Sequence, residues 1–159
     1  MIHEPATRIH KNAIKAWRIA GAIWGLFLFG IPCLYLIGYK SPSFSWMIFV
    51  AGQGVAVVTY VLVVFLFPTI RWKRWRYEVS EKEIDLKRGI IVVKRTLVPM
   101  NRVQHVDTSH GPIYRQFGLS SIRISTAATT HEIPALDDET AGQLRDQIAL
   151  LVRQVKDDV

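Results

Sequence analysis

The sequence predicts a membrane hairpin of two helices, followed by a small, mainly β domain that ends in one α-helix. Two uncharged segments, residues 19–39 and 44–67, are 21 and 24 residues long, and four residues separate them. A helix needs about 20 apolar residues to cross the hydrocarbon core of a bilayer, so each segment can span it once. Short strand-like segments follow, and an amphipathic helical pattern closes the chain.

The formal net charge of +7 is concentrated beside the predicted spans. Residues 1–18 carry +3 and residues 68–76 carry +4, whereas residues 77–159 hold 11 basic and 12 acidic side chains. A nucleic-acid-binding domain is expected to carry its own basic face. The nearly neutral β domain therefore does not indicate a nucleic-acid partner.

The same charges predict the orientation of the hairpin, because Lys and Arg are retained on the cytoplasmic side of membrane helices. Eight of them flank its two outer ends, and only Lys40 lies in the turn. Both termini are therefore predicted to be cytoplasmic, in a multi-pass protein of the inner (plasma) membrane. The first span is too long for a cleaved signal peptide, and residues 36–39 are a poor cleavage site.

Four segments follow from this topology. We expect a cytoplasmic basic segment over 1–18, a two-helix transmembrane hairpin over 19–67, a juxtamembrane segment over 68–76 and a cytoplasmic domain over 77–159. The juxtamembrane segment mixes cations with indoles, which favour the headgroup level. It is interpreted as a topology and anchoring signal, with specific lipid-headgroup binding as the alternative. Its membrane-surface residues are Arg71, Trp72, Lys73, Arg74, Trp75 and Arg76.

Small residues inside the spans predict helix packing, since they allow backbones to approach closely in lipid. Gly52 and Ala56 form a small-xxx-small pair, and Gly52 is expected at the depth of Ile31, where the two helices of the hairpin can pack together. Gly21 and Gly25 face no small residue at their own depth, so we expect them to dock a helix of another subunit. The spans contain no Asp, Glu, Lys, Arg or His, which argues against a transporter and for an anchor.

The remainder of the chain reads as short strands and one helix. Asp137 is a plausible N-cap of that helix, and its apolar residues recur at the 3-4 spacing of a single face. A small open barrel or orthogonal sandwich covered by the helix would bury this face. The predicted strands are residues 77–79, 83–87, 90–98, 103–108, 119–126 and 130–133.

Residues 111–118 form a loop of particular interest, predicted as a single helical turn that Gly118 ends in a left-handed conformation. Phe117 is expected to fill the core. Tyr114 and Arg115 are expected at the surface and are candidate contacts to a partner or to lipid. The alternative is a purely structural crossover.

Four stretches carry a family resemblance: residues 75–79, 98–106, 115–119 and 122–126, with Gly89 before a long strand. Together they resemble the bacterial pleckstrin-homology-like (PH-like) domain of YdbS-type membrane proteins. The resemblance covers about residues 68–155, and the preceding hairpin fits the same group. It implies a PH-like barrel of seven strands in two sheets with a C-terminal helix. It also implies a larger membrane protein with several such domains as partner, and some members are associated with resistance to membrane-active peptides.

The sequence departs from lipid-binding PH domains of eukaryotes at the first hairpin loop. Those domains use a dense basic cluster there, whereas residues 80–83 are net acidic. Phosphoinositide binding is therefore not carried over. The cations of the next hairpin are interpreted as a solvated strand face, with partner or lipid contact as the alternative. They are Lys87, Arg88, Lys94 and Arg95.

No motif in the sequence indicates chemistry. His105 and His110 lack a metal-binding pattern around them, and Asp107, Ser109 and His110 lack a nucleophile elbow. We expect no enzyme activity, metal, cofactor or small-molecule substrate. The sequence thus favours a non-enzymatic membrane protein that assembles with another membrane protein, in line with a role in envelope defence. The alternative is a module that binds anionic lipid headgroups at the inner leaflet.

Overall fold

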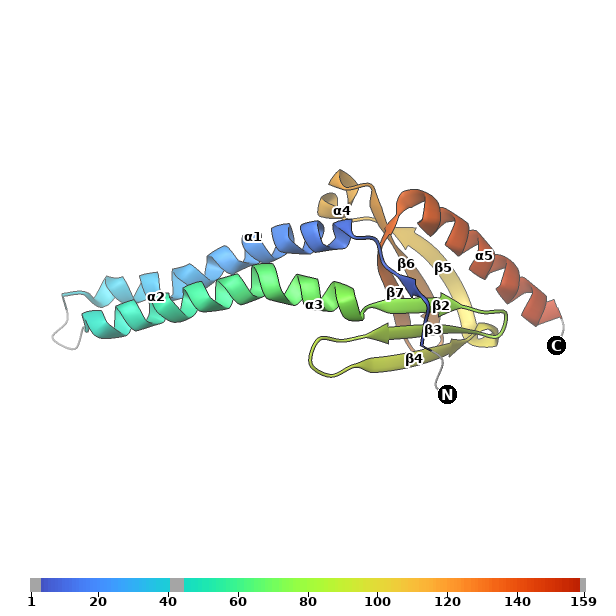
Figure 1. Cartoon of the computed structure of the whole chain (residues 1–159), viewed down its shortest axis with the longest axis horizontal. Coiled ribbons are helices and arrows are strands. Elements are labelled where there is room, and N and C mark those ends of the chain that lie inside the picture. Colours follow the sequence, from blue (N-terminus) through green and yellow to red (C-terminus); the bar gives the residue numbers. More distant parts are fainter. Residues whose placement is uncertain (1–3, 41–44, 158–159) are drawn as a thin grey trace. The chain divides into compact units, whose positions relative to one another are not determined.

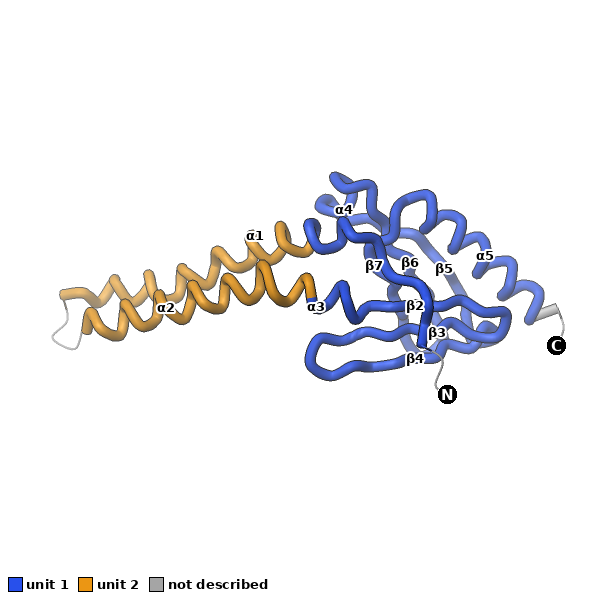
Figure 2. The backbone as a smooth tube through the Cα atoms, in the orientation of Figure 1, with its two compact units in different colours: residues 1–16, 70–159 blue, residues 17–69 orange. Residues whose placement is uncertain are grey.

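The computed structural model describes residues 4–40 and 45–157 of the chain. It consists of two compact units (Figures 1 and 2), which we call the membrane unit and the β unit. The membrane unit comprises residues 17–69. The β unit comprises residues 1–16 together with residues 70–159, so both segments that flank the membrane unit belong to it.

Two helical stretches are long and apolar enough to cross a membrane, Ala13–Gly38 and Trp46–Arg74. The first consists of α1 (Asn12–Tyr35) and a 3₁₀ turn (Leu36–Gly38). The second consists of α2 (Trp46–Val61), a π-helical turn (Leu62–Leu66) and α3 (Phe67–Arg74). The predicted turn between the spans falls on residues 40–43, of which only Lys40 is among the described residues.

The π-helical turn lies next to Pro68, which has no N–H to donate to the preceding turn of helix. A locally wider turn keeps the proline ring away from the carbonyl four residues earlier. The Thr69 hydroxyl donates to the Phe65 carbonyl at 2.9 Å, which satisfies a backbone acceptor inside the predicted bilayer region. The helix can therefore continue through Pro68 to Arg74.

The β unit contains seven antiparallel strands in two sheets, as predicted. The first sheet has the order β1-β2-β3-β4 and the second β5-β6-β7. A short helix α4 (Pro112–Gln116) joins β5 to β6, and the long helix α5 (Asp138–Asp157) follows β7. The strands are β1 (Thr7–Arg8), β2 (Arg76–Val79), β3 (Glu83–Arg88), β4 (Lys94–Pro99), β5 (Val103–Ser109), β6 (Leu119–Thr126) and β7 (Thr130–Asp137).

Along the chain, the membrane unit lies between β1 and β2, the first two strands of the four-stranded sheet. β1 precedes both spans in the chain, and it pairs with β2, which follows them, in the register Thr7↔Tyr77 and Arg8↔Arg76. The sequence does not predict β1, because two residues are too short to show an alternating pattern. Its pairing with β2 holds together the two chain segments that lead to the spans.

The core of the β unit lies between the sheets and α5 (Figure 1). Asp137 caps α5 as predicted, since its carboxylate accepts the Thr140 backbone N–H at 2.9 Å. This hydrogen bond lowers the pKa of the Asp137 carboxyl below its ordinary value. α5 packs on all three strands of the second sheet. Its most buried residues are Ala141, Ile148 and Val152, and those of the sheets include Ile84, Leu86, Leu119, Ile122, Ile124 and Ile133.

Two predicted strand boundaries are wrong. The strand predicted over 90–98 begins only at Lys94, and residues 90–93 form a turn instead. The strand predicted to end at Ile133 continues through Pro134 to Asp137. Pro134 is tolerated because β7 is an edge strand, and the register shifts near this point, where Ala135 has a φ of 53°.

Candidate membrane-interface and partner site

The segments next to the two spans are packed into the β unit. Ile9 and Trp75 are nearly inaccessible, at 2% and 3% exposed. The Trp72 indole donates to the Ile9 carbonyl at 3.0 Å, and the Arg8 guanidinium lies 5.7 Å from the centroid of the Trp72 ring. Trp75 is therefore a core residue of the β unit, whereas the sequence predicts it at the headgroup level. Pro5, Ala13 and Ala16 are buried with it.

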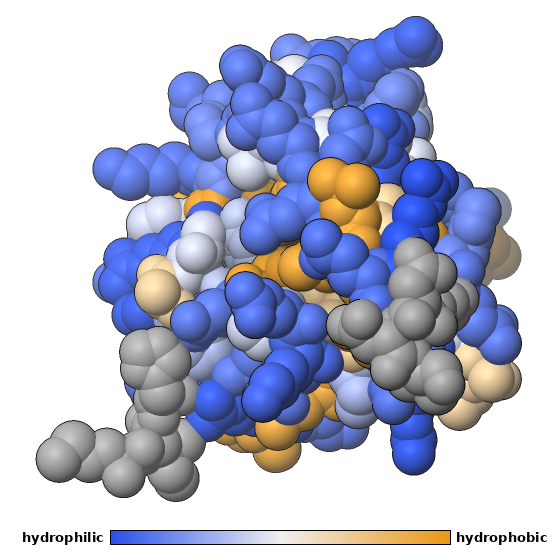
Figure 3. All heavy atoms as spheres, turned by 90° about the vertical axis from the view of Figure 1, so that its right-hand side faces the viewer, coloured by the Kyte–Doolittle hydropathy of each residue, from blue (hydrophilic) through white to orange (hydrophobic). Residues whose placement is uncertain are grey.

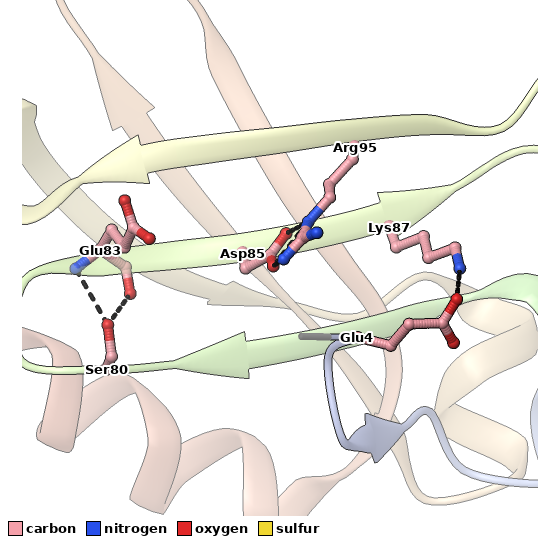
Figure 4. Close-up of polar contacts among 6 residues, drawn as sticks. All are labelled: Glu4, Ser80, Glu83, Asp85, Lys87 and Arg95. Atoms are coloured by element: carbon pink, nitrogen blue, oxygen red, sulfur yellow. Dashed lines mark hydrogen bonds and ion pairs between the residues drawn. The ribbon is translucent and has the colours of Figure 1, made fainter. Parts of the chain in front are cut away.

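Two of the four cations around the β3–β4 turn are held in ion pairs (Figure 4). The Lys87 ammonium lies 2.5 Å from a Glu4 carboxylate oxygen, and this contact lowers the pKa of the Glu4 carboxyl. Arg95 donates to both carboxylate oxygens of Asp85, which raises the pKa of the guanidinium. Lys87 and Arg95 thus have structural partners.

The other two cations, Arg88 and Lys94, face each other across the β3–β4 turn (Gly89–Val93). Neither forms an ion pair within the described part of the chain. Gly89 makes the turn possible: its φ is +136°, and a Cβ there would lie 2.0 Å from the Val92 carbonyl oxygen. The turn therefore brings two unpaired cations to its base.

The β3–β4 turn is apolar and exposed. Ile91 is 88% exposed, Val92 69% and Val93 43%. Sequence reasoning missed this surface because a β-branched run is typical of a buried strand. The available signal was Gly89 at the start of the run together with the basic residues on both sides of it.

An open pocket of about 420 Å³ lies at the base of this turn. The Arg74 guanidinium donates to the Ile90 carbonyl, which ties the turn to the end of α3. None of the seven lining residues is acidic, and three of them are cations. The lining residues are Arg71, Trp75, Arg88, Gly89, Ile90, Val92 and Lys94.

The predicted contact loop contains α4, which ends at Gln116 before Gly118 with its left-handed φ of +60°. Arg115 is exposed, whereas Tyr114 is half-buried. Phe117 is also half-buried, so it does not plug the core as expected. A contact of Tyr114 or Arg115 with a partner stays a prediction.

The small residues of the spans pack the two helices of the membrane unit against each other. A Cβ on Gly25 would lie 2.6 Å from the Tyr60 ring, and one on Gly21 would lie 3.3 Å from the Val63 carbonyl oxygen. This face is therefore used inside the hairpin, which corrects the expectation that it docks another subunit. Gly52 lies against Pro32 near the predicted level, and Ala56 is buried.

Chemistry-bearing side chains are dispersed in the structure. Within residues 4–40 and 45–157, no three His, Cys, Asp or Glu side chains are grouped as a metal site would require. His105 pairs with Asp107 at 2.9 Å, but both are exposed. His131 is half-buried, and burial lowers its pKa, with a further contribution from Arg88. The described side chains thus offer surfaces for contact, and no grouped metal ligands occur among them.

Comparison with known proteins identifies the family. A family model described as "Bacterial PH domain" matches residues 22–152, which include most of the first span, the second span and residues 70–152 of the β unit. The chain belongs to the bacterial PH domain family. The YdbS-type resemblance is likewise confirmed: the chain is 42% identical to the UPF0699 transmembrane protein YdbS of Bacillus subtilis (strain 168), over the full length of both proteins.

A second relative is much larger. UPF0699 transmembrane protein YdbT of the same organism is 26% identical over 99 residues, which are 58% of this chain but only 20% of that protein. The similar region is thus a small part of a longer membrane protein. No solved structure gave a significant match.

Proposed function

We propose that the chain is a non-enzymatic adaptor of the bacterial cell membrane, which assembles with a larger membrane protein that carries several PH-like domains. The observation that carries this proposal is the pair of relatives in one organism. One matches the chain end to end, and the other contains a similar region within a protein about five times that region's length. The family resemblance implies that a short and a longer protein of this kind assemble.

The architecture supports such a role, because the β unit is not a loosely tethered domain. The segments before and after the membrane unit, β1 with Ile9 and α3 with Trp75, are both part of its fold. The β unit is therefore linked to the membrane unit by two chain segments that belong to its own fold. The charge of the flanking segments favours the cytoplasmic side for this unit.

Two surfaces are suited to contact with a second protein. β4 pairs only with β3, so its outer edge offers main-chain donors and acceptors, and Leu97 on this strand is 51% exposed. α4 presents the exposed Arg115. The face drawn in Figure 3 is largely hydrophilic with a small hydrophobic area, as expected for a domain in contact with water. A role in envelope defence is the cellular context that the family resemblance adds.

In-cell photo-crosslinking tests the proposal. A photoreactive amino acid is placed at Leu97 or at Arg115, with a control at the exposed Gln147 of α5. We expect an adduct with a larger membrane protein from Leu97 or Arg115, and none from Gln147. Adducts confined to lipid or to a second copy of the chain would contradict assembly with a larger partner.

A further inference from the structure

The β3–β4 turn is an unusual place for four consecutive β-branched residues. Short turns between strands are ordinarily made of Gly, Asn, Asp, Pro and Ser, because these residues suit the backbone and face water. Ile91 and Val92 are the two most exposed large apolar residues of the described β unit, so most of their apolar surface is in contact with water. An exposed apolar run of this kind indicates a contact surface.

The surroundings of the turn indicate the chemistry of what it contacts. Arg88 and Lys94 at its base form no ion pair within the described chain, and Arg71 completes the cationic lining of the pocket beneath it. An apolar tip above a cationic base matches the layers of an anionic membrane surface. When such a surface inserts, its apolar tip contacts the acyl chains, and its cationic base lies level with the lipid phosphates.

The chain connects this surface directly to the second span. Arg71 and Arg74 lie in the last turn of α3, which continues the second span. Both belong to the β unit, and Arg74 donates to the Ile90 carbonyl. The turn is thus hydrogen-bonded to the end of α3, a basic segment next to the second span that is expected at the headgroup level.

We propose that the β3–β4 turn inserts into the anionic interface of the same bilayer that the chain spans. Ile91 and Val92 enter the region beneath the headgroups, and lipid phosphate occupies the pocket lined by Arg71, Arg88 and Lys94. This inference is independent of the proposed function, since it rests on the β3–β4 turn and its pocket, whereas the proposed partner surfaces are α4 and the outer edge of β4 at Leu97. The test distinguishes membrane insertion from two other outcomes: a protein that covers the turn, and free phosphate in the pocket.

Depth-dependent fluorescence quenching of the full chain in vesicles tests the proposal. Cys33 is replaced by Ser, and an environment-sensitive dye is attached at Ile91→Cys or, as control, at Glu81→Cys. Residue 81 is exposed and lies in the β2–β3 turn, at the other end of β3. We expect a shallow lipid-borne quencher to quench the dye at 91, and not the dye at 81, in phosphatidylcholine vesicles containing phosphatidylglycerol. Equal, weak quenching at both positions would overturn insertion.

The role of the pocket is tested with the pair Arg88→Gln and Lys94→Gln. The control pair, Lys82→Gln and Arg153→Gln, removes the same charge from exposed positions outside the pocket. Each cation near an anionic surface contributes about fivefold to binding, so the first pair is expected to reduce the docked population several-fold and the control pair is not.

Lipid composition separates lipid phosphate from free phosphate. In vesicles of phosphatidylcholine alone, quenching at 91 is expected to be weaker, and added inorganic phosphate is expected not to restore it. Equal quenching in both kinds of vesicle, or equal effects of the two variant pairs, would overturn the phosphate site.

Discussion

The Arg95 guanidinium holds the buried Asp85 carboxylate from a diagonal position across β3 and β4. Asp85 lies opposite Leu97 in the register, two residues from Arg95, and the Arg95 Nε lies 3.1 and 2.9 Å from its two oxygens. Asp85 is only 7% exposed, so its charge depends on this partner. Arg95 therefore has a structural role that distinguishes it from the neighbouring Lys94, although the sequence alone does not distinguish the two cations.

Arg95→Gln is expected to destabilise the β unit by about 1–3 kcal/mol, because it leaves a buried carboxylate without its charged donor. Lys94→Gln, one residue away, is the matched control and is expected to change the free energy of unfolding by no more than about 0.5 kcal/mol. Urea unfolding of the detergent-solubilised chain measures both. Equal stability of the two variants would contradict the structural role of Arg95.

Gly89→Ala is expected to cost about 1–3 kcal/mol, since it places a side chain at a φ of +136° and against the Val92 carbonyl. Gly142→Ala is the control, because residue 142 lies inside α5 and an added Cβ there meets no atom within 4 Å. It is expected to stabilise the helix by about 0.5–1 kcal/mol. Thermal unfolding measures the two changes, and their opposite signs are the prediction.

Gly25→Leu is expected to push α1 and α2 apart, because even a Cβ at this position overlaps the Tyr60 ring. Gly30→Leu is the control, since nothing lies within 4 Å of a Cβ at residue 30. Distances between spin labels on α1 and α2 measure the effect in vesicles. An unchanged distance in Gly25→Leu would contradict the packing of this face inside the hairpin.

The stability of the β unit is expected to fall as the pH drops below about 6.5, in part through His131. Burial lowers the folded pKa of His131 below its ordinary value of 6.5, so its contribution is complete above that value. It is lost as the pH falls from 6.5 through the folded pKa. The Glu4 and Asp137 carboxyls have pKa values below 4.5 and 3.8, so they act in a more acidic range. His131→Gln should therefore flatten the stability profile between about pH 7 and 5. An unchanged slope would contradict this assignment.

Residues 77–159 alone are expected not to form a stable fold. This fragment lacks β1 and the buried side chains of Pro5, Ile9 and Trp75. The absence of these parts exposes apolar surface of the core to water. A chain that joins residues 4–16 to 70–157 through a short flexible linker keeps these contacts and is expected to fold. Dispersed amide resonances in both chains, or in neither, would contradict the proposed boundary.

The sequence was sufficient to predict features that depend on local patterns. The two spans, most strands, the Asp137 cap and the Gly118 stop follow from runs of apolar residues, alternation and backbone conformation. Features that depend on contacts between distant residues were not predictable. Trp72 is of a residue type that is common at membrane interfaces. Its indole nevertheless donates a hydrogen bond to the carbonyl of Ile9, which precedes the membrane unit in the chain. Likewise, only the fold reveals that Lys87 and Arg95 are in ion pairs, whereas Arg88 and Lys94 form none with the described residues.

Purification of the tagged full-length chain from native membranes tests assembly most directly. The membranes are dissolved into polymer-bounded discs that retain lipid, and every protein recovered is identified and quantified. We predict one larger membrane protein with several PH-like domains, recovered in a fixed ratio to the tagged chain and lost from cells that lack the larger protein. Recovery of the chain with no protein in a fixed ratio would contradict the account.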